Sequence, residues 1–121
     1  MILAGGAVGS LARYLISGLP YRFVDQIFPW GTLAVNLIGS FFIGLLWGVF
    51  EEQNLSPNFR SLVFVGFLGG FTTFSTYSLE TLNFLRDGEY KLGLVNVLAN
   101  NILGIGLAFV GFAVARSILS K

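Results

Sequence analysis

Long apolar stretches and short polar connections alternate along the whole chain. A helix needs about 20 apolar residues to cross a hydrocarbon core of about 30 Å. Four windows approach or exceed that length, at residues 2–19, 31–50, 61–85 and 92–119. Proline, asparagine, aspartate and glycine mark the connections between them. The pattern predicts an all-α membrane protein with four transmembrane helices, forming a single integral membrane domain over residues 1–121.

The first window is expected to remain in the mature protein. A secretory signal peptide has a basic segment before an uninterrupted apolar run. No basic segment precedes this window, and Arg13 interrupts it. We therefore expect a retained helix.

The composition favours a membrane protein without enzymatic activity. Of the 121 residues, 55% are hydrophobic and 11% are charged, whereas soluble domains carry roughly 25% charged residues. The sequence contains no Cys and no His, which excludes thiolate and imidazole metal sites and Ser-His or Cys-His nucleophilic pairs. The net charge of +1 is too small to attract the phosphate backbone of a nucleic acid. We expect membrane lipid, and no nucleic acid, among its partners.

The basic residues show no preference for one side of the membrane. Lys and Arg near helix ends usually set the orientation of a membrane protein. Apart from Arg13, they divide three against three, with Arg60, Arg116 and Lys121 on one side and Arg22, Arg86 and Lys91 on the other. This balance predicts insertion in both orientations and an antiparallel, dual-topology homodimer. Alternatively, a feature other than charge fixes one orientation.

Three of the windows carry small and polar residues at every fourth position, which places them on one helix face. These strips are Gly5, Gly9, Arg13 and Ser17; Asn36, Ser40, Gly44 and Gly48; and Asn96, Asn100 and Gly104. Such residues let helices pack closely, with asparagine as a cross-link. Inward-facing asparagines could instead offer N–H donors to an anion. Arg13 is either an interfacial anchor or a group that collects anions at a pore mouth.

The third window contains helix-breaking residues and hydroxyl side chains at positions where a membrane helix is normally apolar. Gly69-Gly70 followed by the β-branched Thr72-Thr73 disfavours regular helix. We therefore expect a break at mid-membrane, near residues 69–73, that frees backbone carbonyls. Freed carbonyls could bond to protein or water, or they could coordinate a Na⁺ ion.

Aromatic rings and hydroxyls follow the expected break. Phe74 and Tyr77 are three residues apart and share a helix face, with the hydroxyls of Ser75, Thr76 and Ser78 beside them. Ring edges carry partial positive charge, so an anion can approach them, and hydroxyl hydrogens can replace its water. The alternative is that the aromatic rings only pack.

Three runs of residues resemble the Fluc (CrcB) family of fluoride channels. They are GFLGGFTTFSTYSLET at 66–81, WGTLAVN at 30–36 and GSLARY at 9–14. The resemblance extends over the whole chain in length, number of apolar windows and order of motifs. It implies a multi-pass protein of the inner cell membrane that exports fluoride passively and so reduces cytoplasmic fluoride toxicity. It also implies an antiparallel homodimer with two fluoride pathways and a structural Na⁺ on the dimer axis.

The same resemblance implies roles for individual residues. The backbone carbonyls of Gly69 and Thr72 would bind the Na⁺, and Arg13 and Glu80 would lie at the aqueous vestibule. The fluoride pathway would be lined by Asn36, Phe74, Ser75, Thr76, Tyr77, Ser78, Asn96 and Asn100. Many family members carry Phe where this chain has Tyr77, so this position has an additional hydroxyl. Asn96 and Asn100 are matched by spacing more than by motif.

Two other function classes fit four short membrane helices. A proton-coupled exporter of small cationic drugs needs a carboxylate at mid-membrane, whereas Glu80 lies toward one end of the third window and the other acidic residues lie in the connections. An accessory membrane subunit would use its asparagines only for packing. A liposome flux assay would distinguish the three functions. Passive fluoride leak would support the fluoride channel, drug-driven proton exchange the exporter, and absence of flux the accessory subunit.

Overall fold

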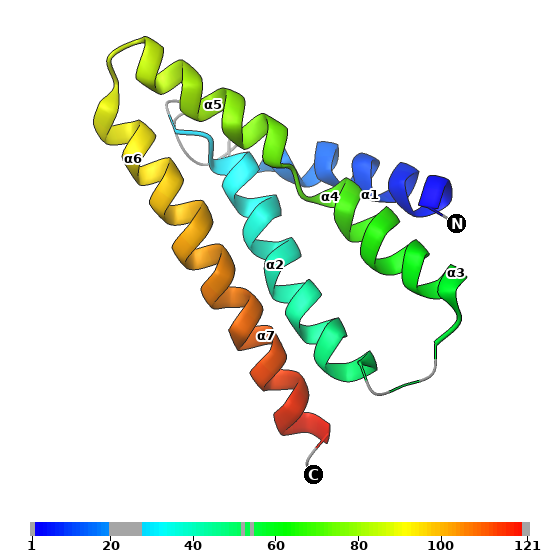
Figure 1. Cartoon of the computed structure of the whole chain (residues 1–121). Coiled ribbons are helices and arrows are strands. Elements are labelled where there is room, and N and C mark those ends of the chain that lie inside the picture. The colour runs from blue at the N-terminus through cyan, green and yellow to red at the C-terminus, as the bar shows by residue number, and fades with distance from the viewer. Residues whose placement is uncertain (1, 20–27, 52, 54, 120–121) are drawn as a thin grey trace.

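Figure 1 shows the computed structural model of the chain, which describes residues 2–19, 28–51, 53 and 55–119. All regular secondary structure in these residues is helical. The elements are α1 (Ile2–Ser17), α2 (Trp30–Phe50), α3 (Pro57–Arg60), the π-helix η2 (Ser61–Leu68), α4 (Gly69–Phe71), α5 (Phe74–Arg86), α6 (Tyr90–Leu98), the π-helix η3 (Ala99–Leu103) and α7 (Gly104–Leu119).

Three helical stretches are long and apolar enough to cross a membrane, namely Trp30–Phe50, Pro57–Arg86 and Tyr90–Leu119. The predicted windows 31–50, 61–85 and 92–119 lie inside them, so the all-helical prediction is confirmed for these segments. The Pro57–Arg86 stretch begins before its window because Ser56 caps it, accepting a hydrogen bond from the Phe59 N–H at 3.2 Å. The first element, α1, has 16 residues, which corresponds to about 24 Å and is shorter than a hydrocarbon core of about 30 Å.

Glycines allow the closest helix contacts. The most extensive helix pair is α2 with α7, which lie side by side in Figure 1. A Cβ atom added at Gly44 would overlap the backbone of α7, and one added at Gly111 would overlap the backbone of α2. Gly5 and Gly9 bring α1 equally close to the backbone of η2. The packing interpretation of these small residues is therefore confirmed.

The regular helix is interrupted between α4 and α5. Thr72 has φ −84° and ψ 162°, and Thr73 has φ −147° and ψ 118°, so both are extended. The Thr72 hydroxyl donates back to the Leu68 carbonyl at 3.0 Å. The Thr73 hydroxyl accepts from the Thr76 N–H at 3.2 Å and caps the start of α5. The two threonine hydroxyls thus satisfy backbone groups at both helix ends.

Charged residues gather at the ends of the long helices. Arg116, near the end of α7, forms an ion pair with Glu51, which directly follows α2. At the opposite end, Arg86 pairs with Asp87 at 3.1 Å in the turn before α6. Gly88 completes this turn with φ 78°, a conformation that favours glycine. Arg22 and Lys121, which are included in the count of basic residues on the two sides of the membrane, lie outside the described residues.

Candidate functional site

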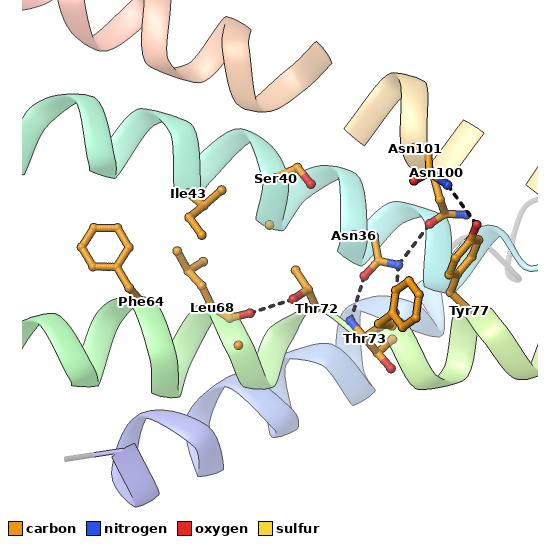
Figure 2. A pocket seen from close by; sticks show the side chains of 13 residues that line it. Asn36, Ser40, Ile43, Phe64, Leu68, Thr72, Thr73, Tyr77, Asn100 and Asn101 are labelled. Atoms are coloured by element: carbon orange, nitrogen blue, oxygen red, sulfur yellow. Dashed lines mark hydrogen bonds between the residues drawn. The ribbon is translucent and has the colours of Figure 1, made fainter. Parts of the chain in front are cut away.

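A cavity of about 310 Å³ lies beside the extended segment between α4 and α5. Figure 2 shows its lining side chains, which come from α2, η2, η3, α5 and the Thr72-Thr73 segment. Six residues predicted for the ion pathway or the Na⁺ site line this one cavity. They are Asn36, Gly69, Thr72, Phe74, Tyr77 and Asn100.

Asn36 of α2 is bound to the extended segment at two points. Its Nδ2 donates to the Thr73 carbonyl at 3.1 Å, and its Oδ1 accepts from the Thr73 N–H at 2.8 Å. Figure 2 shows Asn36 beside Thr73, with dashed lines for these contacts. A buried peptide group without partners costs free energy in an apolar environment. The Asn36 Oδ1 therefore replaces the Gly69 carbonyl, which would accept from the Thr73 N–H in a continuous helix.

A chain of hydrogen bonds leads from Asn36 to the Tyr90–Leu119 stretch. The Asn36 Nδ2 also donates to Asn100 Oδ1 at 3.1 Å, and the Asn100 Nδ2 donates to Asn96 Oδ1 at 3.0 Å. The Asn96 side chain is fully buried, and its Nδ2 donates to Thr81 Oγ1 at 3.0 Å. Thr81 in turn donates to the Tyr77 carbonyl at 2.9 Å. The chain starts at Thr73 and ends on α5, so it closes on the segment from which it starts.

The direction of every bond in this chain is determined by backbone groups. A carbonyl oxygen can only accept, so the Asn36 atom near the Thr73 carbonyl and the Asn100 atom 2.9 Å from the Asn96 carbonyl must be nitrogens. Each of these two nitrogens therefore donates to two protein acceptors. The amides of Asn36 and Asn100 act as cross-links in this arrangement, and their N–H donors are already engaged.

Phe74 and Tyr77 lie side by side at the cavity. Their ring centroids are 5.5 Å apart with planes tilted by 58°. Phe74 is 78% exposed in the single chain, whereas Tyr77 is 8% exposed. The Tyr77 hydroxyl accepts a hydrogen bond from Asn101 Nδ2 at 3.0 Å. The sequence pattern assigns the two rings to one face, and the structure brings them together as expected.

Asn101 is a cavity residue that sequence reasoning missed. The expected spacing of four selects Asn96, Asn100 and Gly104, which would leave Asn101 on another helix face. In the structure, Asn100 and Asn101 lie in the π-helix η3, whose wider turn brings both side chains to the cavity. The adjacent pair Asn100-Asn101 in an apolar helix is the signal that could have found it.

A second cavity of about 230 Å³ lies on the α1 side of the extended segment. Arg13 and Thr76, both predicted site residues, line it together with Thr32 and Thr73. Thr73 also lines the first cavity, so the two cavities meet at this residue. The Arg13 Nε is buried without a hydrogen-bond partner among the described residues. This leaves a cationic group available to a ligand in the second cavity.

Glu80 lies next to this region on α5. The Thr32 hydroxyl donates to Glu80 Oε2 at 2.8 Å, and Thr32 itself is buried. The other carboxylate oxygen, Oε1, is buried without a partner in the described part of the chain. Glu80 is thus held at one oxygen and open to a further donor at the other.

Four predicted residues line neither described cavity, namely Ser75, Ser78, Glu80 and Asn96. Ser75 is exposed and Ser78 half-buried on α5, and neither lines the 310 Å³ or the 230 Å³ cavity of the described chain. Asn96 is also behind the cavity wall, where it holds Asn100. The structure therefore divides the predicted residues into those that line a cavity and those that lie outside both, namely the Asn96 amide, the Glu80 carboxylate and the hydroxyls of Ser75 and Ser78.

Comparison with known proteins identifies the family. The family model of CrcB-like protein, Camphor Resistance (CrcB), matches residues 1–112. A protein of Parabacteroides distasonis named fluoride-specific ion channel FluC is 45% identical over 99% of this chain and 94% of its own length. Proteins of the same name from Magnetococcus marinus and Pyrococcus abyssi are each 47% identical, over 97% and 96% of this chain and 96% and 94% of their own lengths. On this similarity, which covers nearly its full length, the chain belongs to the CrcB-like protein family.

Proposed function

We propose that this multi-pass membrane protein is a fluoride-specific ion channel of the inner cell membrane and that it has no enzymatic activity. The observation that carries the proposal is its 45% and 47% identity, over nearly full length, to relatives named fluoride-specific ion channel FluC. Several residues of the runs that carry the resemblance line the 310 Å³ cavity, among them Asn36, Phe74 and Tyr77. Passive export of fluoride would lower its cytoplasmic concentration and reduce its toxicity.

The two cavities suit the entry and the inner part of a fluoride pathway. Arg13, whose buried Nε has no hydrogen-bond partner in the described part of the chain, would attract fluoride into the second cavity. Thr73 borders both cavities, so the ion would pass it to reach Phe74 and Tyr77. There the ring edges and nearby hydroxyls would replace water around the ion, because ring edges carry partial positive charge. Ser75 and Ser78 would extend this row of hydroxyls along α5.

The extended segment also suits a structural Na⁺ ion. It lies near the centre of the Pro57–Arg86 stretch, which corresponds to mid-membrane. In a continuous helix, the carbonyls of Gly69 and Thr72 would accept from the N–H groups of Thr73 and Thr76. Those two N–H groups donate instead to Asn36 Oδ1 at 2.8 Å and to Thr73 Oγ1 at 3.2 Å. The carbonyls of Gly69 and Thr72 are thereby released from their helical donors.

Carbonyl oxygens are hard ligands, and unwound helices in membrane proteins use them to bind Na⁺. We infer that Gly69 and Thr72 of each subunit would hold the ion on the axis of a homodimer. When bound, the cation would neutralise the partial negative charge of these carbonyls and link the two extended segments.

An antiparallel homodimer would complete the pathway. Phe74 is 78% exposed in the single chain although it lies at the cavity, and a second copy would enclose this ring. The even division of basic residues, three against three, gives no preference between orientations. We therefore propose that the two copies insert in opposite directions.

A vesicle efflux assay tests the proposed function. Purified protein in liposomes loaded with fluoride should release fluoride passively, and matched liposomes loaded with chloride should retain it. Proton exchange driven by a cationic drug would instead support an exporter, and absence of any flux would support an accessory subunit. Either of these results would overturn the fluoride channel.

A further inference from the structure

The orientation of the Asn101 amide determines what the Tyr77 hydroxyl can do. The Asn101 Nδ2 lies 2.8 Å from the Val97 carbonyl and 3.0 Å from the Tyr77 hydroxyl oxygen. The Val97 carbonyl can only accept, so the amide atom facing both groups must be the nitrogen. Tyr77 is therefore the acceptor of its bond with Asn101, and its own phenolic proton is not used in that bond.

This proton is one of few that the cavity leaves available. Both amide nitrogens of Asn36 and Asn100 already donate to protein acceptors. The Thr72 hydroxyl donates to the Leu68 carbonyl at 3.0 Å. Among the polar side chains that line the cavity in the described residues, only Ser40, Thr73 and Tyr77 have a hydroxyl proton for which no acceptor is found.

Tyr77 is the strongest donor of these three hydroxyls. A phenol is more acidic than the aliphatic hydroxyl of serine or threonine, and it therefore donates a stronger hydrogen bond to an anion. The bond that it accepts from Asn101 polarises it further, because hydrogen bonds in a chain strengthen one another. The Tyr77 ring is 8% exposed and packs 5.5 Å from Phe74, so its position is fixed.

We propose that the Tyr77 hydroxyl is a direct hydrogen-bond donor to fluoride in this cavity and that Asn101 is the positioning residue that keeps its proton free. The proposal rests on the proposed function, since it names a ligand group for the ion that the channel would conduct. It assigns to Tyr77 a second contribution beside its ring edge. A hydroxyl donor favours small fluoride over larger chloride, because a small anion forms the shorter and stronger bond.

The substitutions Tyr77→Phe and Asn101→Leu test the two residues. Tyr77→Phe removes one oxygen and keeps the ring, and it should raise the fluoride concentration for half-maximal liposome flux about tenfold, as expected for loss of a hydrogen bond to an ion. Asn101→Leu should raise it several-fold when Tyr77 is present and leave it unchanged when residue 77 is Phe. The control is Tyr90→Phe, which changes an exposed tyrosine at the start of α6.

Infrared spectroscopy gives a readout that a purely structural role would not affect. Addition of fluoride should shift the C–O stretching band of one tyrosine in the native protein and in the Tyr90→Phe variant, and this shift should be absent from the Tyr77→Phe variant. The proposal is overturned if native protein conducts fluoride while Tyr77→Phe leaves both half-saturation and the spectral shift unchanged. It is equally overturned if Asn101→Leu has the same effect with Tyr or Phe at residue 77. Failure of the native protein to conduct fluoride would instead refute the proposed function.

Discussion

Asn36 of α2 and Thr73 of the Pro57–Arg86 stretch exchange two hydrogen bonds. The Asn36 Nδ2 donates to the Thr73 carbonyl at 3.1 Å, and the Thr73 N–H donates to Asn36 Oδ1 at 2.8 Å. The Asn36 Oδ1 thus takes the place of the helical acceptor that the Thr73 N–H loses. The pair also connects the backbone around the proposed Na⁺ site to the amide chain through Asn100. One side chain therefore supports both the extended backbone and the cavity wall.

The first prediction concerns this pair. Asn36→Leu keeps the side-chain size but leaves the Thr73 N–H without its acceptor and removes a donor from the Thr73 carbonyl, which should cost about 1 to 3 kcal/mol of stability and abolish fluoride flux. Thermal unfolding in detergent and liposome efflux measure the two effects. Asn58→Leu is the matched control, because Asn58 is exposed in α3. Full flux and stability in Asn36→Leu would contradict the role assigned to the pair.

The second prediction concerns the far end of the amide chain. Thr81→Val removes the acceptor that the fully buried Asn96 amide uses at 3.0 Å. The unsatisfied N–H should destabilise the protein by about 1 to 3 kcal/mol, and fluoride flux should fall because Asn100 loses its support. Thr81→Ser keeps the hydroxyl and should behave like the native protein. Equal behaviour of the Val and Ser variants would show that the hydroxyl does not hold the chain.

Sequence reasoning works well for the long helices and less well for the polar contacts. The windows 31–50, 61–85 and 92–119 all fall inside observed helical stretches, because the apolar length needed to cross a bilayer leaves little freedom. The shorter α1 has 16 residues although its window extends to residue 19. Gly18 and Leu19 follow the helix, and glycine at this position weakens its last turn.

The candidate site could be predicted in its residues but only partly in its hydrogen bonds. Residue type and spacing select Asn36 and Asn100 as inward-facing amides, which they are. Spacing does not reveal that backbone carbonyls take up their donors. For Asn36 this depends on how two helices meet, and for Asn100 the acceptor is the carbonyl four residues earlier in its own helix. Asn101 escapes a periodic analysis because η3 is a π-helix, and the preference for this wider turn has no simple sequence pattern.

The third prediction tests the ring edge of Phe74. Phe74→Ile removes the partial positive ring edge and keeps an apolar side chain, so fluoride flux should fall about tenfold or more, a factor that corresponds to about 1.4 kcal/mol. The dimer should remain intact in size-exclusion chromatography. Phe109→Ile is the control, because Phe109 is 72% exposed on α7 and is not among the residues that line the 310 Å³ cavity in the described chain. The ring-edge role is wrong if both variants conduct like the native protein.

The fourth prediction concerns the proposed Na⁺ ion. If the carbonyls of Gly69 and Thr72 bind it, the protein should unfold at a lower temperature when Na⁺ is replaced by the bulky cation N-methylglucamine, and Na⁺ should restore it. A ligand present at 100 times its dissociation constant stabilises the folded state by about 2.7 kcal/mol. Fluoride flux should decline with stability in the same titration. A melting temperature that does not depend on Na⁺ would argue against a bound ion.

The fifth prediction tests the two-way insertion through charge. Gln53→Lys and Asn58→Lys add two cations at exposed positions near the second connection. The number of basic residues on that side of the membrane then exceeds the number on the other side. Since Lys and Arg near helix ends set orientation, this variant should insert one way, form no antiparallel dimer and conduct no fluoride.

A second variant with Asp87→Lys and Glu89→Lys is biased the opposite way by exposed residues in the turn before α6. Coexpression should restore flux because each variant supplies the orientation that the other lacks. Flux from either variant alone would mean that a parallel dimer or a single chain conducts.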